Sequence, residues 1–425
     1  METQKQNILV IGGGGREHAI CWTLKKSKRV GKIYCIPGNA GIFDIAECHP
    51  DIAATDLTKI VDFVAAHPDI YMTVVAPDDP LALGLVDILQ SKGFRTFGPS
   101  KLAAELEASK VFSKDFMKRN KIPSAEYEVF SDYKKADKYL TSAKYPLVIK
   151  ADGLALGKGV AICNDVASAK SSLVEMMLDK KFGKACDKVV IEEFLTGFEV
   201  SVLAFCDGRT VVPMVSSQDH KRALDNDMGL NTGGMGTFSP SLTYTDEMEN
   251  TAFDTIFIPT IEGLKNEGRE FKGVIYFGLM VESADNIKVL EYNARFGDPE
   301  AQVVLPRLEN DLLDIFDACI DQKLCEIAFA WKECACVCVV AASGGYPLDI
   351  EKGKEIAIGK LDDDMIVFHA GTAIKDGKLV TNGGRVLGLT SLGASIDEAR
   401  EKVYKNIKNI SFDGMHYRTD IGKKK

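Results

Sequence analysis

The sequence predicts an α/β protein with a parallel β-sheet near its start, a two-lobed central region and a small β-rich domain at its end. Over the first ~105 residues, short apolar segments alternate with helical patterns, an order typical of a parallel sheet with helices on both faces. From 123 to 194 short strands with two helices indicate a compact insertion, and after Trp331 short strands and Gly-Gly pairs indicate a separate domain. We therefore expect an N-terminal α/β domain at 1–105, a main lobe at 106–122 and 195–330, a small lobe at 123–194 and a β-rich domain at 331–425.

The composition excludes several classes of protein. The 425 residues carry a net charge of −9, which disfavours general nucleic-acid binding and requires a locally basic pocket for any anionic substrate. No apolar run approaches the ~20 residues that span a bilayer, and the polar start lacks the layout of a signal peptide. The 11 cysteines show no C-x-x-C spacing, and those between Cys334 and Cys338 alternate as in a strand. We expect them to pack as small apolar residues in a cytoplasmic protein.

The first strand, residues 7–11, ends in four glycines that open a helix. Ligands of open α/β sheets bind beyond the carboxyl ends of strands, and glycines at a helix start expose N–H groups to an anion. A dinucleotide site is disfavoured, because the frame from Gly12 ends in Glu17 where close packing requires Gly or Ala. The second strand, 32–36, ends in Pro37–Asn39 without an acid for a ribose hydroxyl. A phosphorylated small molecule suits this turn better; the alternative is a tight turn without ligand.

Further elements follow in order. Residues 57–66 predict a helix, residues 71–75 a third strand, and residues 101–120 one long helix with an apolar face and Lys110 in its middle.

A strand at 146–150 ends in Lys150 and enters a loop, Gly153–Gly159, that contains Lys158 and leads to a strand at 160–163. Strand, glycine loop and strand do not make a Walker P-loop, which opens a helix. They predict a hairpin whose tip can fold over phosphates, with lysines as point charges. A plain glycine-rich hairpin with solvated lysines is the alternative.

Two later segments carry polar groups in unusual places. The buried strand from residue 189 ends in Glu192 and Glu193, and this junction can offer backbone groups to an adenine edge, although a plain strand end is the better interpretation of this segment taken alone. Residues 216–240 form a long glycine-rich segment that includes Asp219–Arg222. Loops of this length in compact domains are usually functional or disordered, and the His and two cations favour an anion-facing loop.

A strand at 288–293 places Glu291 and Asn293 on one face, because alternate residues of a strand point the same way. Arg295 follows on the same parity. One carboxylate, one amide oxygen and one fixed cation suit Mg²⁺ bound to phosphates, since Mg²⁺ usually takes one or two carboxylates and completes its shell with water and phosphate oxygens. A strand end with solvated polar residues is the alternative for this motif taken alone.

Together these motifs resemble the phosphoribosylamine–glycine ligases, a family of ATP-grasp enzymes. The matching segments, in chain order, are GGGGREHAI at 12–20, PGNAG at 37–41, FGPS at 97–100, IKADGLALGKGV at 149–160, VIEEFLTG at 190–197, QDHKR at 218–222, NTGGMG at 231–236, LEYNARFGDPEAQ at 290–302, FHAGT at 368–372 and GGRVL at 383–387. Two segments depart from the pattern. Ala76–Pro80 stands where Gly-Pro-Glu-Asp-Pro is expected, and Tyr276–Leu279 has no acid that could serve as a third metal ligand.

The resemblance implies a Rossmann-like N-terminal domain that binds substrate, a two-lobed ATP-grasp domain and a β-rich C-terminal domain. It implies that ATP, glycine and 5-phosphoribosylamine give ADP, phosphate and glycinamide ribonucleotide through a glycyl phosphate, in purine biosynthesis. Mg²⁺ or Mn²⁺ is the implied cofactor, and the implied partners are these small molecules, with no nucleic acid and no membrane. We expect a monomer or a weak homo-oligomer.

Residue roles follow from the same resemblance. Catalytic roles are implied for Lys150, Asp219, Lys221 and Arg295, and metal ligation for Glu291 and Asn293. The implied ATP contacts are Lys110, Lys150, Gly153, Gly157, Lys158, Gly159, Glu192, Glu193, Leu195 and Glu199. The ribose and its phosphate are assigned to Gly12, Gly13, Gly14, Gly15, Arg16, Glu17, Pro37, Gly38, Asn39, His220 and Arg222.

Two other classes stay open: another ATP-grasp carboxylate–amine ligase or carboxylase, and a protein that binds nucleotide without turnover. The combination of PGNAG and QDHKR argues against the first. Retention of Lys150, Glu291, Asn293 and Arg295 argues against the second, because a non-catalytic relative could lose any of them.

Overall fold

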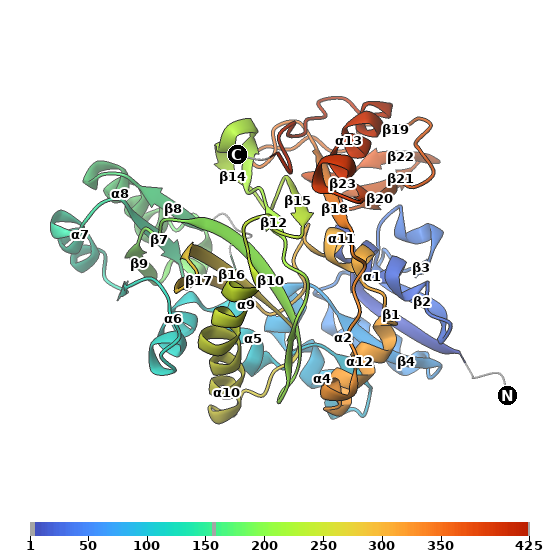
Figure 1. The fold of residues 1–425 in the computed structure, drawn as a ribbon, viewed down its shortest axis with the longest axis horizontal. Coiled ribbons are helices and arrows are strands. Elements are labelled where there is room, and N and C mark those ends of the chain that lie inside the picture. The colour runs from blue at the N-terminus through green and yellow to red at the C-terminus, as the bar shows by residue number, and fades with distance from the viewer. Residues whose placement is uncertain (1–4, 155–158, 424–425) are drawn as a thin grey trace.

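The computed structural model describes residues 5–154 and 159–423 and begins with a parallel sheet (Figure 1). Its five strands lie in the order β3-β2-β1-β4-β5, and every adjacent pair is parallel. Apolar side chains of β1 pack on both faces, Leu9 and Ile11 on one and Ile8 and Val10 on the other. The predicted helix-covered parallel sheet is confirmed. Its strands are β1 (Gln6–Gly12), β2 (Val30–Pro37), β3 (Glu47–Cys48), β4 (Ile70–Val75) and β5 (Thr96–Phe97), and its helices are α1 (Gly15–Leu24), α2 (Leu57–Ala66), α3 (Asp78–Leu83) and α4 (Leu85–Ser91).

The single helix expected at 101–120 is wrong: the structure has two helices, α5 (Lys101–Ala108) and α6 (Lys110–Arg119). Ser109 between them has an extended backbone and caps α6, accepting a hydrogen bond from the Phe112 N–H. Its hydroxyl also donates to Asp152, 2.9 Å away, on the loop after strand β7 (Leu147–Ala151). The apolar periodicity continues through this break, so the cap residue alone marks it.

A small lobe follows, on the left of Figure 1. It is a four-stranded antiparallel sheet in the order β6-β9-β7-β8, and it has its own apolar core against two helices. The strands are β6 (Tyr127–Phe130), β7 (Leu147–Ala151), β8 (Val160–Cys163) and β9 (Val189–Glu193), and the helices are α7 (Tyr133–Ser142) and α8 (Val166–Leu173).

The main lobe is built on a second antiparallel sheet, in the order β11-β10-β16-β17. Helices of this lobe pack on it, and its core is continuous with that on one face of the N-terminal sheet. The elements are β10 (Phe198–Asp207), β11 (Val211–Pro213), β16 (Lys272–Ser283), β17 (Asn286–Asn293), α9 (Asp246–Ala252), α10 (Ile258–Asn266), α11 (Ala301–Val304) and α12 (Leu312–Asp321).

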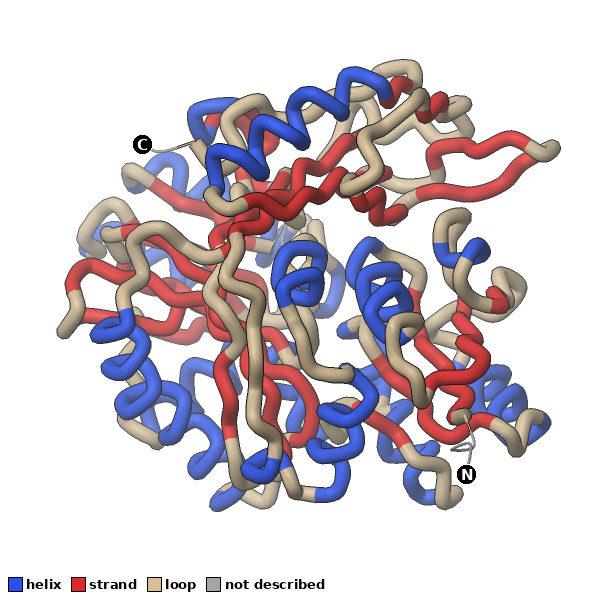
Figure 2. The backbone as a smooth tube through the Cα atoms, turned by 45° about the vertical axis from the view of Figure 1, so that its right-hand side comes forward, coloured by secondary structure: helices blue, strands red, loops and turns tan. Residues whose placement is uncertain are grey.

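The last sheet combines two distant parts of the chain. Strands β12 (Gln218–Asp219) and β15 (Gly236–Ser239) continue into β18 (Ala335–Ala342), in the order β12-β15-β18-β23-β20. Helix α13 lies along this sheet at the top of the molecule (Figure 2). Cys336 and Cys338 of β18 are fully buried free thiols, which confirms their predicted apolar role. The remaining elements are β13 (Arg222–Leu224), β14 (Met228–Asn231), β19 (Ala357–Ile358), β20 (Ile366–His369), β21 (Thr372–Lys375), β22 (Lys378–Thr381), β23 (Arg385–Gly393), α13 (Ile396–Asn406) and β24 (Ile410–Ser411).

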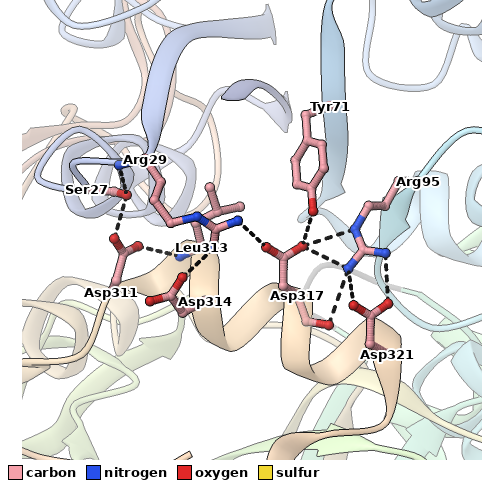
Figure 3. Close-up of polar contacts among 9 residues, drawn as sticks. All are labelled: Ser27, Arg29, Tyr71, Arg95, Asp311, Leu313, Asp314, Asp317 and Asp321. Carbon is pink, nitrogen blue, oxygen red and sulfur yellow. Dashed lines mark hydrogen bonds and ion pairs between the residues drawn. The ribbon is translucent and has the colours of Figure 1, made fainter. Parts of the chain in front are cut away.

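An ion-pair network joins α12 to the N-terminal sheet (Figure 3). Asp317 accepts hydrogen bonds from Arg29 at 2.9 Å, Arg95 at 2.8 Å and the Tyr71 hydroxyl at 2.8 Å. Arg95 also contacts Asp321, 2.8 Å away and one turn further along the helix. Acids spaced three to four residues apart lie on one helix face, so α12 meets both arginines at once.

Within the described residues, none of the helices combines the length and the apolar character that crossing a bilayer requires.

Candidate active site

A cavity of about 600 Å³ lies where the N-terminal sheet, both central lobes and the C-terminal sheet meet. Residues on its walls come from every region of the chain, including α5, β7, β9, β17 and the start of β23. Sites that take small molecules are commonly clefts of this size between structural units. The cavity therefore defines the candidate site.

Strand β17 supplies the predicted oxygen ligands. It pairs with β16, so that Glu291 lies opposite Gly278 and Asn293 opposite Tyr276. Both residues line the cavity. Tyr292 between them also lies at its wall, but its hydroxyl is 2.8 Å from the Thr260 hydroxyl and its ring belongs to the core. The strand alternation that the sequence predicted is thus present. Gly278 offers no side chain beside Glu291, and the described residues contain no group of three acidic, His or Cys ligands.

Arg295 is held in a fixed position at the end of β17. Its Nη2 lies 2.8 Å from the Glu107 carboxylate and donates to the Asn293 side-chain oxygen at 3.2 Å, and its Nη1 donates to the Phe296 carbonyl. The other Glu107 oxygen accepts from the Ala294 N–H at 2.7 Å. Although burial acts against its charge, Glu107 and further acids raise the pKa of Arg295 above its usual value, so it is a permanent cation.

Three lysines from β7 and α6 line the cavity: Lys110, Lys114 and Lys150. The Lys110 ammonium donates to the Gly153 carbonyl at 2.9 Å, and that of Lys150 donates to the Leu290 carbonyl at 3.1 Å. Lys150 also pairs with the buried carboxylate of Glu192, which Lys114 contacts from the other side at 2.6 Å. Burial alone would raise the pKa of Glu192, but the two ammonium groups keep it below its usual value.

Lys114 was missed from the sequence. It lies four residues after Lys110, on the same face of α6, and this spacing is the signal that could have identified it.

Only part of the segment Asp219–Arg222 faces the cavity. Asp219 and Lys221 line the cavity, and the Lys221 ammonium is 3.1 Å from Glu291. Against the effect of burial, the charge of Lys221 lowers the pKa of Glu291 to about 2. His220 and Arg222 do not line the cavity: the His220 ring is buried beside the Gly236 carbonyl, and Arg222 donates to the Gly229 carbonyl at 2.8 Å. Burial, followed by the charge of Arg418, lowers the pKa of His220 to about 4.

The N-terminal glycine turn packs more closely than the sequence indicated. A Cβ on Gly13 would lie 2.4 Å from the Gly38 carbonyl oxygen, and one on Gly15 would lie 2.4 Å from the Gln302 side chain. Glu17 accepts a hydrogen bond from the Gly14 N–H at 2.6 Å. Of the turn Gly12–Glu17, only Arg16 lines the cavity, so these glycines permit close packing between elements.

Asn39 links the same turn to the C-terminal sheet. Its amide donates to the carbonyls of Gly13 and His369, and its oxygen accepts from the N–H groups of Gly41 and Ile42. Neither Asn39 nor its neighbours Pro37 and Gly38 line the cavity. The side chain of Asn39 is fully engaged in shaping the loop.

The predicted nucleotide contacts are brought together in part. Gly153, Gly159, Glu193, Leu195 and Glu199 line the cavity together with the three lysines. Gly157 and Lys158 lie outside the described residues.

Several cavity residues were not assigned from the sequence. Arg385 of β23 donates to the carbonyls of Gly233 and Asp298 and pairs with the Asp298 carboxylate at 3.4 Å. Asp298 and Glu300 directly follow the predicted metal strand, and Arg385 belongs to the recognised GGRVL segment, so their positions in these motifs were the available signals. Asp78 lies in Ala76–Pro80, the segment that departs from the family pattern, and that departure was its signal, whereas Glu107 and Tyr346 carry none.

Comparison with known proteins gives consistent matches along the chain. Three models of phosphoribosylglycinamide synthetase match it: the N domain at residues 6–107, the ATP-grasp (A) domain at 108–301 and the C domain at 336–424. The phosphoribosylamine–glycine ligase of Halalkalibacterium halodurans is 47% identical over 419 residues, which are 98% of this chain and 97% of that protein. The enzyme of that name from Caldanaerobacter subterraneus subsp. tengcongensis is 47% identical over 414 residues, covering 97% and 99%.

Solved structures support the same family assignment. The crystal structure of phosphoribosylamine–glycine ligase from Thermotoga maritima has 34% sequence identity and a TM-score of 0.83, covering 98% of this chain and all of that one. A biotin carboxylase domain from Hydrogenobacter thermophilus, 14% identical with a TM-score of 0.75 over 98% of this chain and 92% of that one, shares the fold alone. The predicted fold class and family resemblance are confirmed. The chain belongs to the phosphoribosylglycinamide synthetase family, whose central domain is an ATP-grasp domain.

Proposed function

We propose that the protein is a phosphoribosylamine–glycine ligase of purine biosynthesis. It joins glycine to 5-phosphoribosylamine with ATP, giving glycinamide ribonucleotide, ADP and phosphate. The observation that carries the proposal is the cavity in which Glu291, Asn293 and Arg295 face Lys110, Lys150 and Lys221. Family membership along the whole chain supports it.

ATP occupies the part of the cavity between the lobes. Phosphoryl transfer requires in-line positioning and compensation of phosphate charge more than covalent help. Lys110, which donates to the Gly153 carbonyl, and Lys150 supply that charge. The backbone at Glu193–Leu195 receives the adenine edge, with Glu199 at the ribose hydroxyls. The carboxylate of Glu192 is already engaged by two lysines, which supports an indirect role in placing Lys150.

The residues present fit a divalent cation. Glu291 and Asn293 provide two hard oxygen donors, and the low pKa of Glu291 keeps it ionised at any physiological pH. Mg²⁺ or Mn²⁺ bound there would neutralise phosphate charge. Two protein ligands are typical of Mg²⁺ that also binds substrate phosphates.

The chemistry proceeds in two displacements. A carboxylate oxygen of glycine attacks the γ-phosphorus and ADP leaves, which gives glycyl phosphate. The amine of the ribosylamine then attacks the acyl carbon, phosphate leaves and the nitrogen loses a proton. Arg295, fixed by Glu107, faces the acyl phosphate oxygens throughout.

Lys221 and Asp219 line the same wall, and Asp219 is a suitable proton acceptor. Its burial, together with the neighbouring Glu300, raises the pKa of Asp219 well above the usual value. Lys221 adds a cation beside the reacting oxygens.

The ribose phosphate is assigned to the wall where Arg16 faces the cavity, at the carboxyl end of β1. The glycine turn and Pro37–Asn39 support this wall from behind, where Asn39 donates to the Gly13 carbonyl. His220 and Arg222 flank Lys221 in the chain and support its wall instead. We also propose the division at 1–105, 106–122 with 195–330, 123–194 and 331–425, a cytoplasmic location, and a monomeric or weakly associating protein.

The test is ADP release with Mg²⁺, ATP and glycine, with and without 5-phosphoribosylamine generated in place from phosphoribosyl pyrophosphate and ammonia. Release that requires both glycine and the amine is the expected result. Release with neither means an ATPase or another acceptor, and ATP binding without release means a nucleotide-binding protein; either outcome overturns the proposal.

A further inference from the structure

The acids on the cavity wall differ in whether the protein supplies a partner for the carboxylate. Eight of the nine carboxylates are engaged by a cation or a hydrogen-bond donor of the protein. Their partners are Arg295 for Glu107, Lys114 and Lys150 for Glu192, Lys288 for Glu193, Lys221 for both Glu199 and Glu291, the His220 N–H for Asp219, Gln302 and Arg385 for Asp298, and Ser201 for Glu300. Among the residues that the structure describes, Asp78 is the one acid of this wall without a hydrogen bond or ion pair.

Asp78 is nevertheless held in place by its backbone. It is the first residue of α3, between Pro77, whose backbone is extended, and the neighbours Asp79 and Pro80 within the first turn. The loop directly follows β4 of the buried parallel sheet. Nearby prolines restrict the backbone, which fixes the direction in which the Asp78 side chain leaves the chain.

Helix α3, which begins at Asp78, packs against α5, which carries Glu107. The charge of Asp78 acts on both Arg295 and Glu107. Glu107 is committed to Arg295 through one oxygen and to the Ala294 N–H through the other. A fixed guanidinium and a free carboxylate therefore share one end of the cavity, and Nε of Arg295 is buried there without a partner among the described residues.

We propose that Asp78 and Arg295 form the subsite for the amino-acid substrate, in which Arg295 binds the α-carboxylate and Asp78 binds the α-ammonium group. This inference rests on the proposed ligase function and specifies how its carboxylate substrate is selected. A zwitterion satisfies both charges at once, whereas acetate or formate would leave Asp78 unpaired.

The assignment also explains how a side reaction is avoided. A free amino group of one glycine could attack glycyl phosphate and give a dipeptide. An ammonium group bound to a carboxylate has no lone pair and cannot attack, so only the ribosylamine serves as nucleophile. Asp78 is thus a specificity-determining residue that contacts the substrate away from the reacting carbonyl.

The test compares Asp78→Asn with Asp79→Asn, an exposed acid in the same helical turn that does not line the cavity. Loss of a charge-assisted hydrogen bond predicts an increase of roughly tenfold or more in the KM for glycine of Asp78→Asn. The KM for ATP should stay within about twofold, and Asp79→Asn should match the wild type. A glycine KM for Asp78→Asn within about twofold of wild type overturns the subsite.

Two further measurements keep the inference testable if Asp78→Asn is inactive or unfolded. Equilibrium binding of radiolabelled glycine to an inactive but folded variant should be at least tenfold weaker than to wild type, with ATP binding retained; unchanged glycine binding overturns the subsite. With the wild-type protein, the inhibition constant of acetate against glycine should be at least ten times the dissociation constant of glycine. Equal constants for acetate and glycine overturn the subsite. If wild type releases no ADP, the ligase proposal fails, and the glycine-binding comparison still decides the subsite.

Discussion

Removal of one charge from the buried group of Glu192, Lys114 and Lys150 gives the sharpest test of the site's electrostatics. Glu192→Gln keeps the shape but leaves two ammonium groups without a counter-charge. Side chains of Glu192 and Lys114 are only 3% and 4% exposed. Breaking a buried ion pair by removing one partner costs about 3–5 kcal/mol, and we expect a loss of stability in this range.

The adjacent residue provides the control. Glu193 pairs with Lys288 at 2.9 Å, but these side chains are 40% and 31% exposed. Surface pairs contribute about 0–1 kcal/mol, so Glu193→Gln should lose at most that amount. The losses of stability caused by Glu192→Gln and Glu193→Gln are thus expected to differ by about 3 kcal/mol, because only the pairs of Glu192 are buried away from water.

The pH dependence provides a second check. Burial and the charge of Lys150 keep the pKa of Lys114 below its usual value, opposed by Glu192, so removal of Glu192 lowers it further. Between the folded pKa of Lys114 and the unfolded value of about 10.4, the unfolded state binds more protons, and stability rises with pH. The free energy of unfolding that Glu192→Gln loses relative to wild type should therefore become smaller between pH 7 and 9.

The assay is hydrogen–deuterium exchange of peptides from α6, β7 and β9 across a urea series, because it measures the small lobe directly. Equal unfolding midpoints for Glu192→Gln and Glu193→Gln would refute the buried charge group. A stability deficit of Glu192→Gln that grows with pH would contradict the assignment of Lys114 as the cation whose pKa is lowered in this buried group.

Three further predictions concern other parts of the molecule. Glu291→Gln should lower Mg²⁺-dependent ADP release by about 100-fold or more while the protein stays folded, since a metal-binding carboxylate is lost; turnover like that of wild type would contradict the metal assignment. Arg95→Met removes contacts to Asp317 and Asp321 and should cost about 1 kcal/mol in urea denaturation at low salt and less at 1 M NaCl, and a deficit that salt does not change would exclude an ionic origin. Burial, then the neighbouring His369, lowers the pKa of His18 to about 3; the unfolded state therefore binds the extra proton below pH ~6.5, and wild-type stability should decline from there toward pH 4. His18→Gln should show a shallower decline in melting temperature over that range, and parallel curves would refute this.

The sequence predicted those features that depend on local pattern. Strand alternation placed Glu291 and Asn293 side by side, and the observed register on β16 agrees with it. The parallel sheet followed from the alternation of strands and helices, and the free thiols Cys336 and Cys338 followed from their two-residue spacing.

Features that depend on long-range packing were not predictable from the same patterns. The break at Ser109 occurs because its hydroxyl bonds to Asp152, 43 residues away. Glu107 contacts Arg295 from 188 positions earlier in the chain, and nothing in its own neighbourhood marks it. The glycine turn looked open to a ligand, but Gly38 and Gln302 fill the space against it.

The sheet β12-β15-β18-β23-β20 has a consequence for how the protein matures on the ribosome. Asp219 lies on β12, and β12 is joined through β15 to β18, which is synthesised about a hundred residues later. A nascent chain that has completed the ATP-grasp segment still lacks the strand on which this wall of the cavity is supported. The wall that carries Asp219 is therefore completed only after β18 has been synthesised, whereas the strands that carry Lys150 and Glu291 pair within earlier parts of the chain.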